Sequence, residues 1–148
     1  MARQVTMRIR TAAIALTVAL SVPMTVRPGA QDNPDGKGKT PERTTLSGIY
    51  TDLQVARGEE TYYASCVNCH PRGTYAGQSF KANWGGRPLS DLYDWVLNRM
   101  PKNDPGTLTP EQSVDVIAYI LKENSLPAGK TKIPADEAAL KAIRIQLR

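Results

Sequence analysis

The side chains best suited to chemistry in this 148-residue chain lie within one short stretch. Residues 65–73 read SCVNCHPRG and contain both cysteines and the only histidine of the chain. One helical turn brings Cys66 and Cys69 to the same side, and His70 follows directly. This C-x-x-C-H spacing attaches a c-type haem through two thioether bonds, with the histidine as an iron ligand. We therefore predict one covalent haem c held by Cys66, Cys69 and His70.

Three other uses of paired cysteines explain the stretch less well. A zinc site needs four ligands, and the chain has no Cys or His beyond these three, so a carboxylate would have to be recruited. A thioredoxin-like redox pair is expected beside a strand–helix–strand unit, which this sequence pattern lacks. A structural disulfide suits an exported protein but leaves the position of the histidine unexplained.

The second axial ligand decides whether a haem iron carries electrons or offers an open site for chemistry. The chain has four methionines, and three of them precede residue 31: Met1, Met7 and Met24. The fourth, Met100, lies 30 residues after His70 and precedes Pro101, which disfavours helical conformation at Met100 and so places it in a loop. We predict Met100 as the distal ligand. The alternative is a methionine packed in the core beside an iron that is open or bound by a lysine.

The first predicted helix carries the cysteines at its end. It begins after Thr51, whose side chain would form a capping box with Gln54. Its apolar face consists of Val55, Gly58, Tyr62 and Cys66. A glycine inside a helix costs about 1 kcal/mol relative to alanine, so Gly58 on the buried face indicates close approach of another backbone.

Two further helices are predicted after the motif. One has Ser90 as its cap and stops at Met100, with an apolar face of Leu89, Leu92, Tyr93, Val96 and Met100. The other has Thr109 as its cap, Pro110 at its first position and Gln112 at its third, and ends near Asn124. Its apolar face consists of Val114, Ile117, Ala118 and Leu121. No segment shows the alternation of a strand, so the predicted fold class is all-α.

The N-terminal residues are predicted to be a signal peptide, residues 1–30. Three arginines within residues 1–10 precede an uncharged apolar run at residues 11–22, which is shorter than the roughly 20 residues that span a bilayer. Cleavage is therefore expected, with an uncleaved anchor as the alternative. The formal net charge of +5 falls to +1 without this segment, since the remainder has 15 basic and 14 acidic residues. This balance gives no ground for a nucleic-acid surface.

The rest of the chain divides by composition. Residues 31–46 mix glycine and proline with charges, and we predict a flexible linker there. The periodic helical pattern occupies residues 47–129, the predicted domain. Residues 130–148 form a C-terminal extension in which residues 135–143 could form a short helix.

The helical segments and the motif together resemble a mono-haem class I cytochrome c. The resemblance covers roughly residues 48–129 and rests on three stretches: GIYTDLQVARGEETYYASCVNCH, FKANWGGRPLSDLYDWVLNRMP and GTLTPEQSVDVIAYILKENSLPAG. The sequence is particularly similar to the small bacterial cytochrome domains associated with quinoprotein dehydrogenases and with cbb3-type oxidase subunits. The resemblance implies three to five helices wrapped around one covalently attached haem.

The resemblance also implies roles for single residues. Gly58 and Tyr62 would match the family's first-helix glycine and aromatic residue, which cross the last helix near Tyr119. Phe80 and Trp84 would match aromatic residues that line the haem pocket, although either fits a plain core position. The sequence departs from the family pattern directly after His70. Pro71 stands where the family usually has a small flexible residue, so the family predicts neither the path of this loop nor the carbonyl that orients the histidine.

From these residues we expect a periplasmic electron carrier rather than an enzyme. Iron held by a histidine and a methionine has no open position, and it exchanges single electrons with redox partner proteins, a dehydrogenase donor and an oxidase or cytochrome acceptor. Two alternatives stay open. One is a haem enzyme or gas sensor with an open distal site, and the other is a membrane-anchored subunit of a respiratory complex.

Overall fold

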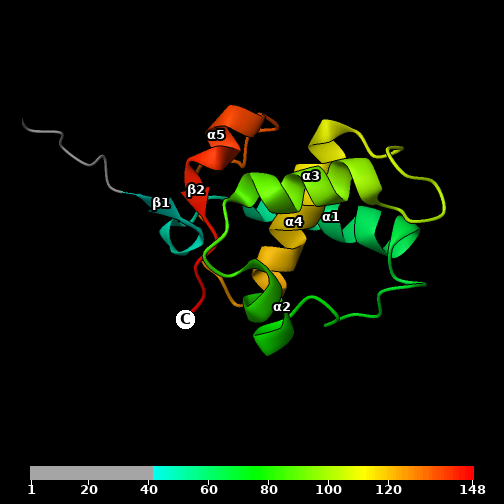
Figure 1. Cartoon of the computed structure of the whole chain (residues 1–148), viewed down its shortest axis with the longest axis horizontal. Coiled ribbons are helices and arrows are strands. Elements are labelled where there is room, and N and C mark those ends of the chain that lie inside the picture. The colour runs from blue at the N-terminus through cyan, green and yellow to red at the C-terminus, as the bar shows by residue number, and fades with distance from the viewer. Residues whose placement is uncertain (1–41) are drawn as a thin grey trace, which may run out of the picture. The chain divides into compact units, whose positions relative to one another are not determined.

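The computed structural model describes residues 42–148. The predicted signal peptide and residues 31–41 of the predicted linker lie outside the described residues. The described part contains five helices and two very short strands (Figure 1). In chain order the elements are β1 (Arg43–Thr44), a 3-10 turn (Thr45–Ser47), α1 (Asp52–Ser65), α2 (Gly77–Trp84), α3 (Leu89–Arg99), α4 (Pro110–Glu123), α5 (Glu137–Lys141) and β2 (Ile143–Arg144). The all-α prediction is confirmed.

Helices α1 and α4 cross at close range, and this pair forms the centre of the fold (Figure 1). Gly58 on α1 lies so near α4 that an added Cβ would stand 1.9 Å from the carbonyl oxygen of Asp115. One turn further along α1, the rings of Tyr62 and Tyr119 pack with centroids 5.1 Å apart. The side chain of Arg57 spans the same crossing with two hydrogen bonds to the Asp115 carboxylate, at 2.6 and 2.9 Å. The close approach inferred from Gly58 is therefore confirmed.

Two of the three predicted helices, α1 and α4, begin at the N-cap residue that the sequence predicts. Helix α4 has the predicted capping box, in which the Thr109 hydroxyl accepts from the Gln112 amide and the Gln112 side chain accepts from the Thr109 amide. Helix α1 has Thr51 as its N-cap, as predicted. The prediction for α3 is wrong by two residues, since Ser90 lies buried inside the helix and Pro88 occupies the cap position without a side-chain hydrogen bond.

Gln54 does not complete the capping box predicted for α1. Its side chain is buried and turns to the C-terminal tail, where Nε2 donates to the Ile133 carbonyl at 3.1 Å and Oε1 accepts from the Ile133 amide at 2.8 Å. A buried backbone segment needs such partners, because unpaired amide and carbonyl groups are costly away from water. The tail therefore competes successfully with the helix N-terminus for this side chain.

The structure places both ends of the described chain in the folded unit. Strands β1 and β2 pair in parallel, with Arg43 opposite Ile143, so the prediction of a flexible linker is wrong for residues 43–46. Residues 130–148 are more than an appendage, because their apolar side chains complete the core: Ile133, Leu140, Ile143 and Ile145 are each 1% exposed or less. A short helix, α5, lies within residues 135–143 and packs on α3. Two-residue strands offer few backbone hydrogen bonds, so burial of these apolar side chains contributes to holding the tail in place.

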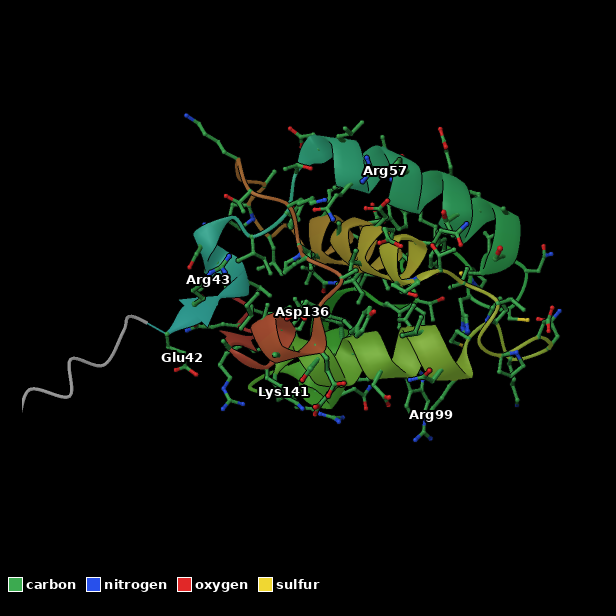
Figure 2. All side chains as sticks on the ribbon, turned by 90° about the horizontal axis from the view of Figure 1, so that it is seen from above. Glu42, Arg43, Arg57, Arg99, Asp136 and Lys141 are labelled. Atoms are coloured by element: carbon green, nitrogen blue, oxygen red, sulfur yellow. The ribbon has the colours of Figure 1, made fainter. Side chains whose placement is uncertain are left out.

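The surface of the described part carries both positively and negatively charged side chains. Figure 2 shows Arg57 on α1, Arg99 on α3 and Lys141 on α5 at the surface. Lys141 pairs with Glu137 one turn away, at 2.7 Å. Among residues 42–148, no helix has both the length and the apolar character required to cross a bilayer.

Candidate haem site

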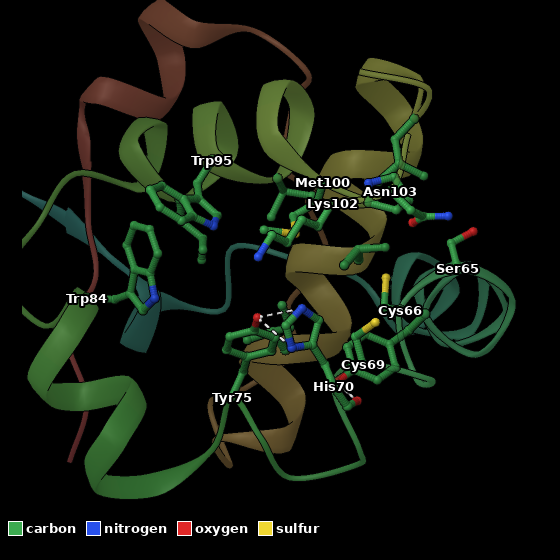
Figure 3. Close-up of a pocket in the computed structure, with 17 residues that line it drawn as sticks. Ser65, Cys66, Cys69, His70, Tyr75, Trp84, Trp95, Met100, Lys102 and Asn103 are labelled. Carbon is green, nitrogen blue, oxygen red and sulfur yellow. Dashed lines mark hydrogen bonds between the residues drawn. The ribbon is translucent and has the colours of Figure 1, made fainter. Parts of the chain in front are cut away.

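The four residues expected to hold the cofactor line one cavity. Cys66 and Cys69 follow the end of α1, His70 begins the next loop, and Met100 directly follows α3. In Figure 3, Met100 lies on one side of the cavity and His70 on the other, with the two cysteines together at one end. The space bounded by the lining residues is about 660 Å³, including the part open to solvent.

Apolar side chains from two helices and the loop between them form much of the cavity wall. The contributors from α3, α4 and the loop between them are Leu92, Val96, Leu108, Val116 and Ile120. All five are buried. Such a wall suits a large planar macrocycle, because it excludes water and lowers the local dielectric around an iron centre.

Both cysteines are free thiols in the structure. Cys66 is half-buried, and burial raises the pKa of its thiol, whereas Cys69 is exposed at the mouth of the cavity. Within residues 42–148, no group of three or more His, Cys, Asp and Glu side chains is placed to hold a metal ion. The donors gathered here are two thiols, one imidazole and one thioether, which is the set that a covalent haem requires.

The backbone of the motif is held by α1. The His70 amide donates to the Cys66 carbonyl at 2.9 Å, and the Tyr62 hydroxyl donates to the His70 carbonyl at 2.6 Å. Burial first, and then the nearby Cys66 thiol, raises the pKa of Tyr62 to about 12, so this hydroxyl keeps its proton near neutral pH. The ring of His70 has a separate neighbour, the Tyr75 hydroxyl, 3.1 Å from Nδ1 and 3.2 Å from Nε2.

Two tryptophans form the end of the cavity that lies away from the cysteines (Figure 3). The rings of Trp84 and Trp95 meet edge to face, with centroids 6.3 Å apart. Arg87 lies over the ring of Trp84 and Arg99 over that of Trp95, each at 4.8 Å from the ring centroid. A wider groove continues outward past these side chains toward Lys141 of α5. This end of the site therefore has two arginines stacked on aromatic rings, within a groove that carboxylates also line.

Sequence reasoning found some of these lining residues and missed others. Trp84 lines the cavity, but the companion prediction for Phe80 is not met, because Phe80 packs in the core at 1% exposure and is not among the lining residues. Trp95 was missed, although its place one helical turn after Leu92 was a usable signal. Tyr75 had no such signal, because its contact with His70 depends on how the loop after the motif folds.

The fold and the cavity together define the class, a mono-haem class I cytochrome c domain. Residues 53–120 match the family described as cytochrome c oxidase, cbb3-type, subunit III, and this segment runs from α1 into α4 and includes all four candidate ligands. No curated protein and no solved structure gives a significant match to the chain. A cytochrome c domain of this kind implies covalently bound haem c with its iron. The chemistry that this group supplies is reversible transfer of a single electron.

Proposed function

We propose that the protein is a periplasmic mono-haem cytochrome c that carries single electrons from a dehydrogenase to a downstream acceptor or oxidase. In this proposal Cys66 and Cys69 form the thioether bonds, and His70 and Met100 are the axial ligands. The single observation that carries it is the position of Met100, which lines the same cavity as the other three residues. A histidine and a thioether fill both axial positions, and a thioether favours the reduced iron.

The surroundings of the cavity support a carrier more than an enzyme. General acid–base catalysis needs a positioned proton donor or acceptor, and His70, the one histidine of the chain, is assigned to the iron. The charged side chains in the groove at the Trp84 end are of both signs, and two of the bases are held in ion pairs, Arg87 with Asp91 and Lys141 with Glu137. Burial of the macrocycle against the apolar wall also disfavours the extra charge of the oxidised state and so raises the potential.

The sequence supports export through a signal peptide and weak docking to partner proteins. The arginine-containing start and the apolar run of residues 11–22 have the form of a signal peptide. The net charge of about +1 that remains after its removal favours weak docking at a small surface over strong electrostatic steering. The mass of the mature protein, recovered from the periplasmic fraction, tests cleavage directly. A full-length chain retained in the membrane fraction would favour the anchored subunit instead.

Absorption spectra of the protein produced with a cytochrome c maturation system test attachment and ligation together. We expect covalent haem that is low-spin in both oxidation states, with the weak red charge-transfer band of methionine ligation in the oxidised state. Met100→Ala should abolish that band and admit carbon monoxide to the reduced iron.

Lys102 provides the matched control, because it also lines the cavity and is the neighbouring candidate ligand. Lys102→Ala should leave the spectrum unchanged. Loss of the low-spin spectrum in Lys102→Ala but not in Met100→Ala would show that the distal ligand is Lys102 and not Met100. High-spin haem in the unaltered protein would favour the open-site alternative, and absence of covalent haem would refute both readings.

A further inference from the structure

We propose that the C-terminal tail, residues 130–148, raises the reduction potential of the haem by closing the end of the cavity that lies away from the cysteines. The tail holds residues 85–88, the loop between α2 and α3 that places Trp84 and Arg87 at this end. This inference rests on the proposed function, because the haem supplies the potential that is measured. The tail lies beyond the family match, which ends at residue 120.

Backbone hydrogen bonds join the tail directly to this loop. The Gly86 amide donates to the Ile145 carbonyl at 2.8 Å, and the Ile145 amide donates to the Arg87 carbonyl at 2.9 Å. Pro88 and Arg144 extend this pairing by an antiparallel bridge. Gly86 has a φ of 78°, a left-handed conformation that glycine adopts without strain. The tail therefore fixes the path of the backbone between α2 and α3.

The loop held in this way positions part of the end wall of the cavity. Trp84, the last residue of α2, lines the cavity directly before the loop (Figure 3). The guanidinium of Arg87 lies over the Trp84 ring, 4.8 Å from its centroid, and the Arg87 amide donates to the Trp84 carbonyl at 3.1 Å. Arg87 also pairs with Asp91 of α3 at 2.8 Å. A shift of the loop therefore changes how these side chains cover the cavity.

The tail is itself anchored on the side that faces away from the loop. The hydroxyl of the buried Thr45 donates to the Gln146 carbonyl at 2.6 Å and accepts from the Gln146 amide at 2.9 Å. The side chain of Ile145 is 0% exposed. Helix α5 packs on α3 and places Glu137 and Lys141 in the groove outside the two tryptophans. The tail therefore supports the end wall from behind and also lines the groove outside it.

Closure of this end affects the reduction potential because it limits the access of water. The oxidised state of the centre carries an additional positive charge, which nearby water stabilises. A wall that keeps water out therefore disfavours the oxidised state and raises the potential. A loosened wall should lower it.

Ile145→Ala tests this support without changing a residue that lines the haem cavity. Truncation of a buried isoleucine should loosen the tail, so we expect hydrogen exchange of the Gly86 amide to be about ten-fold faster or more, relative to the amide of Ile117 in α4. We also expect a more negative reduction potential, with the low-spin spectrum retained. Exchange is measured by NMR and the potential by redox titration, both on the haem-loaded protein.

Ile133→Ala is the matched control. Ile133 is also a buried isoleucine of the tail, at 1% exposure, but its backbone bonds to the Gln54 side chain of α1 rather than to the loop. This variant should lose stability as well, and it should leave both the potential and the ratio of Gly86 to Ile117 exchange unchanged. An equal fall in potential in the two variants would overturn the inference, because it would reflect a general loss of stability.

The possible results separate this inference from the proposed function. Absence of covalent low-spin haem in the unaltered protein would refute the proposed function. With low-spin haem present, an unchanged potential in Ile145→Ala would overturn the role of the tail, and unchanged Gly86 exchange would show that the tail does not hold the loop. If Ile145→Ala does not accumulate, Ile145→Val replaces it. It should shift both quantities in the same directions by smaller amounts, and no shift would overturn the inference.

Discussion

Tyr62 and Tyr119 pack ring against ring where α1 crosses α4, but their hydroxyl groups differ in hydrogen bonding. The Tyr62 hydroxyl donates to the His70 carbonyl at 2.6 Å. The Tyr119 hydroxyl is buried without a hydrogen-bond partner among the described residues. A hydrogen bond contributes about 0.5–1.5 kcal/mol to stability, whereas a buried polar group without a partner costs about 1–3 kcal/mol. The same chemical change should therefore have different effects at the two positions.

Phenylalanine substitution tests this difference. Tyr62→Phe should lower the free energy of unfolding by about 1 kcal/mol, because the His70 carbonyl loses its donor. Tyr119→Phe should leave it unchanged or raise it. Urea denaturation of both variants gives the comparison, with Tyr63→Phe as an exposed control. An equal loss of stability in Tyr62→Phe and Tyr119→Phe would contradict the assignment.

At the scale of the helices, the sequence predicts a side-chain contact correctly when both partners lie a few residues apart and no distant group competes for them. The capping box of α4 was predictable because Thr109 and Gln112 lie three residues apart and nothing distant competes for either side chain. Gln54 has the same local signal, yet its side chain is bound by Ile133, 79 residues away. The four residues that line the cavity as candidate ligands could be picked out from the sequence, because three lie within one five-residue motif and the fourth is the one methionine after residue 30. The contact of Tyr75 with His70 could not be predicted, since it depends on how the loop after the motif folds.

Gly58 provides a direct test of the α1–α4 contact. At an exposed helical position, Gly→Ala stabilises by about 1 kcal/mol through helix propensity. At position 58 the added methyl group would stand 1.9 Å from the Asp115 carbonyl oxygen, so the two helices would have to separate. We expect Gly58→Ala to destabilise the protein by about 1–3 kcal/mol or more, the usual cost of overpacking. Thermal unfolding measures the change, and Glu60→Ala on the exposed face of the same helix is the control. A stabilised Gly58→Ala protein would show that the helices are not in contact there.

At the scale of the whole molecule, the segment that matches the cytochrome family and the C-terminal tail share one core. The family match ends at residue 120, but the buried side chains of Ile133, Leu140, Ile143 and Ile145 lie beyond it. The tail also pairs with the extended backbone after α2, where Ile145 exchanges hydrogen bonds with Gly86 and Arg87 at 2.8 and 2.9 Å. Residues 130–148 therefore support the segment that leads into α3 and on to Met100.

Gln54 is the polar contact that joins this tail to α1, and Gln54→Glu makes its contribution depend on pH. An ionised carboxylate can accept from the Ile133 amide but cannot donate to the Ile133 carbonyl. Burial should raise the pKa of the introduced carboxyl above its unfolded value of about 4.3. Stability is then highest below that value and is lost as pH rises through the raised folded pKa.

The measurement is urea denaturation between about pH 4 and pH 8, within the range where this pKa shift acts. Gln54→Glu should lose stability relative to the unaltered protein as pH rises. Gln112→Glu is the matched control, because Gln112 is exposed at the start of α4 and a carboxylate there favours the helix dipole. Identical pH profiles for the two variants would show that Gln54 does not hold the tail.

The parallel pairing of β1 with β2 has a further consequence for where a tag or tether can be attached to the protein. Glu42 and Arg144 form an ion pair at 2.9 Å, so the start of the described chain lies beside its last residues. In Figure 1 these strands and the C-terminus lie at one end of the fold, and the end of α1, which leads into the cysteines, lies at the other. A tag or tether fused at the C-terminus would therefore leave from the end of the fold opposite the thiols. Surface immobilisation through such a tether should leave the cysteine end of the cavity facing solution.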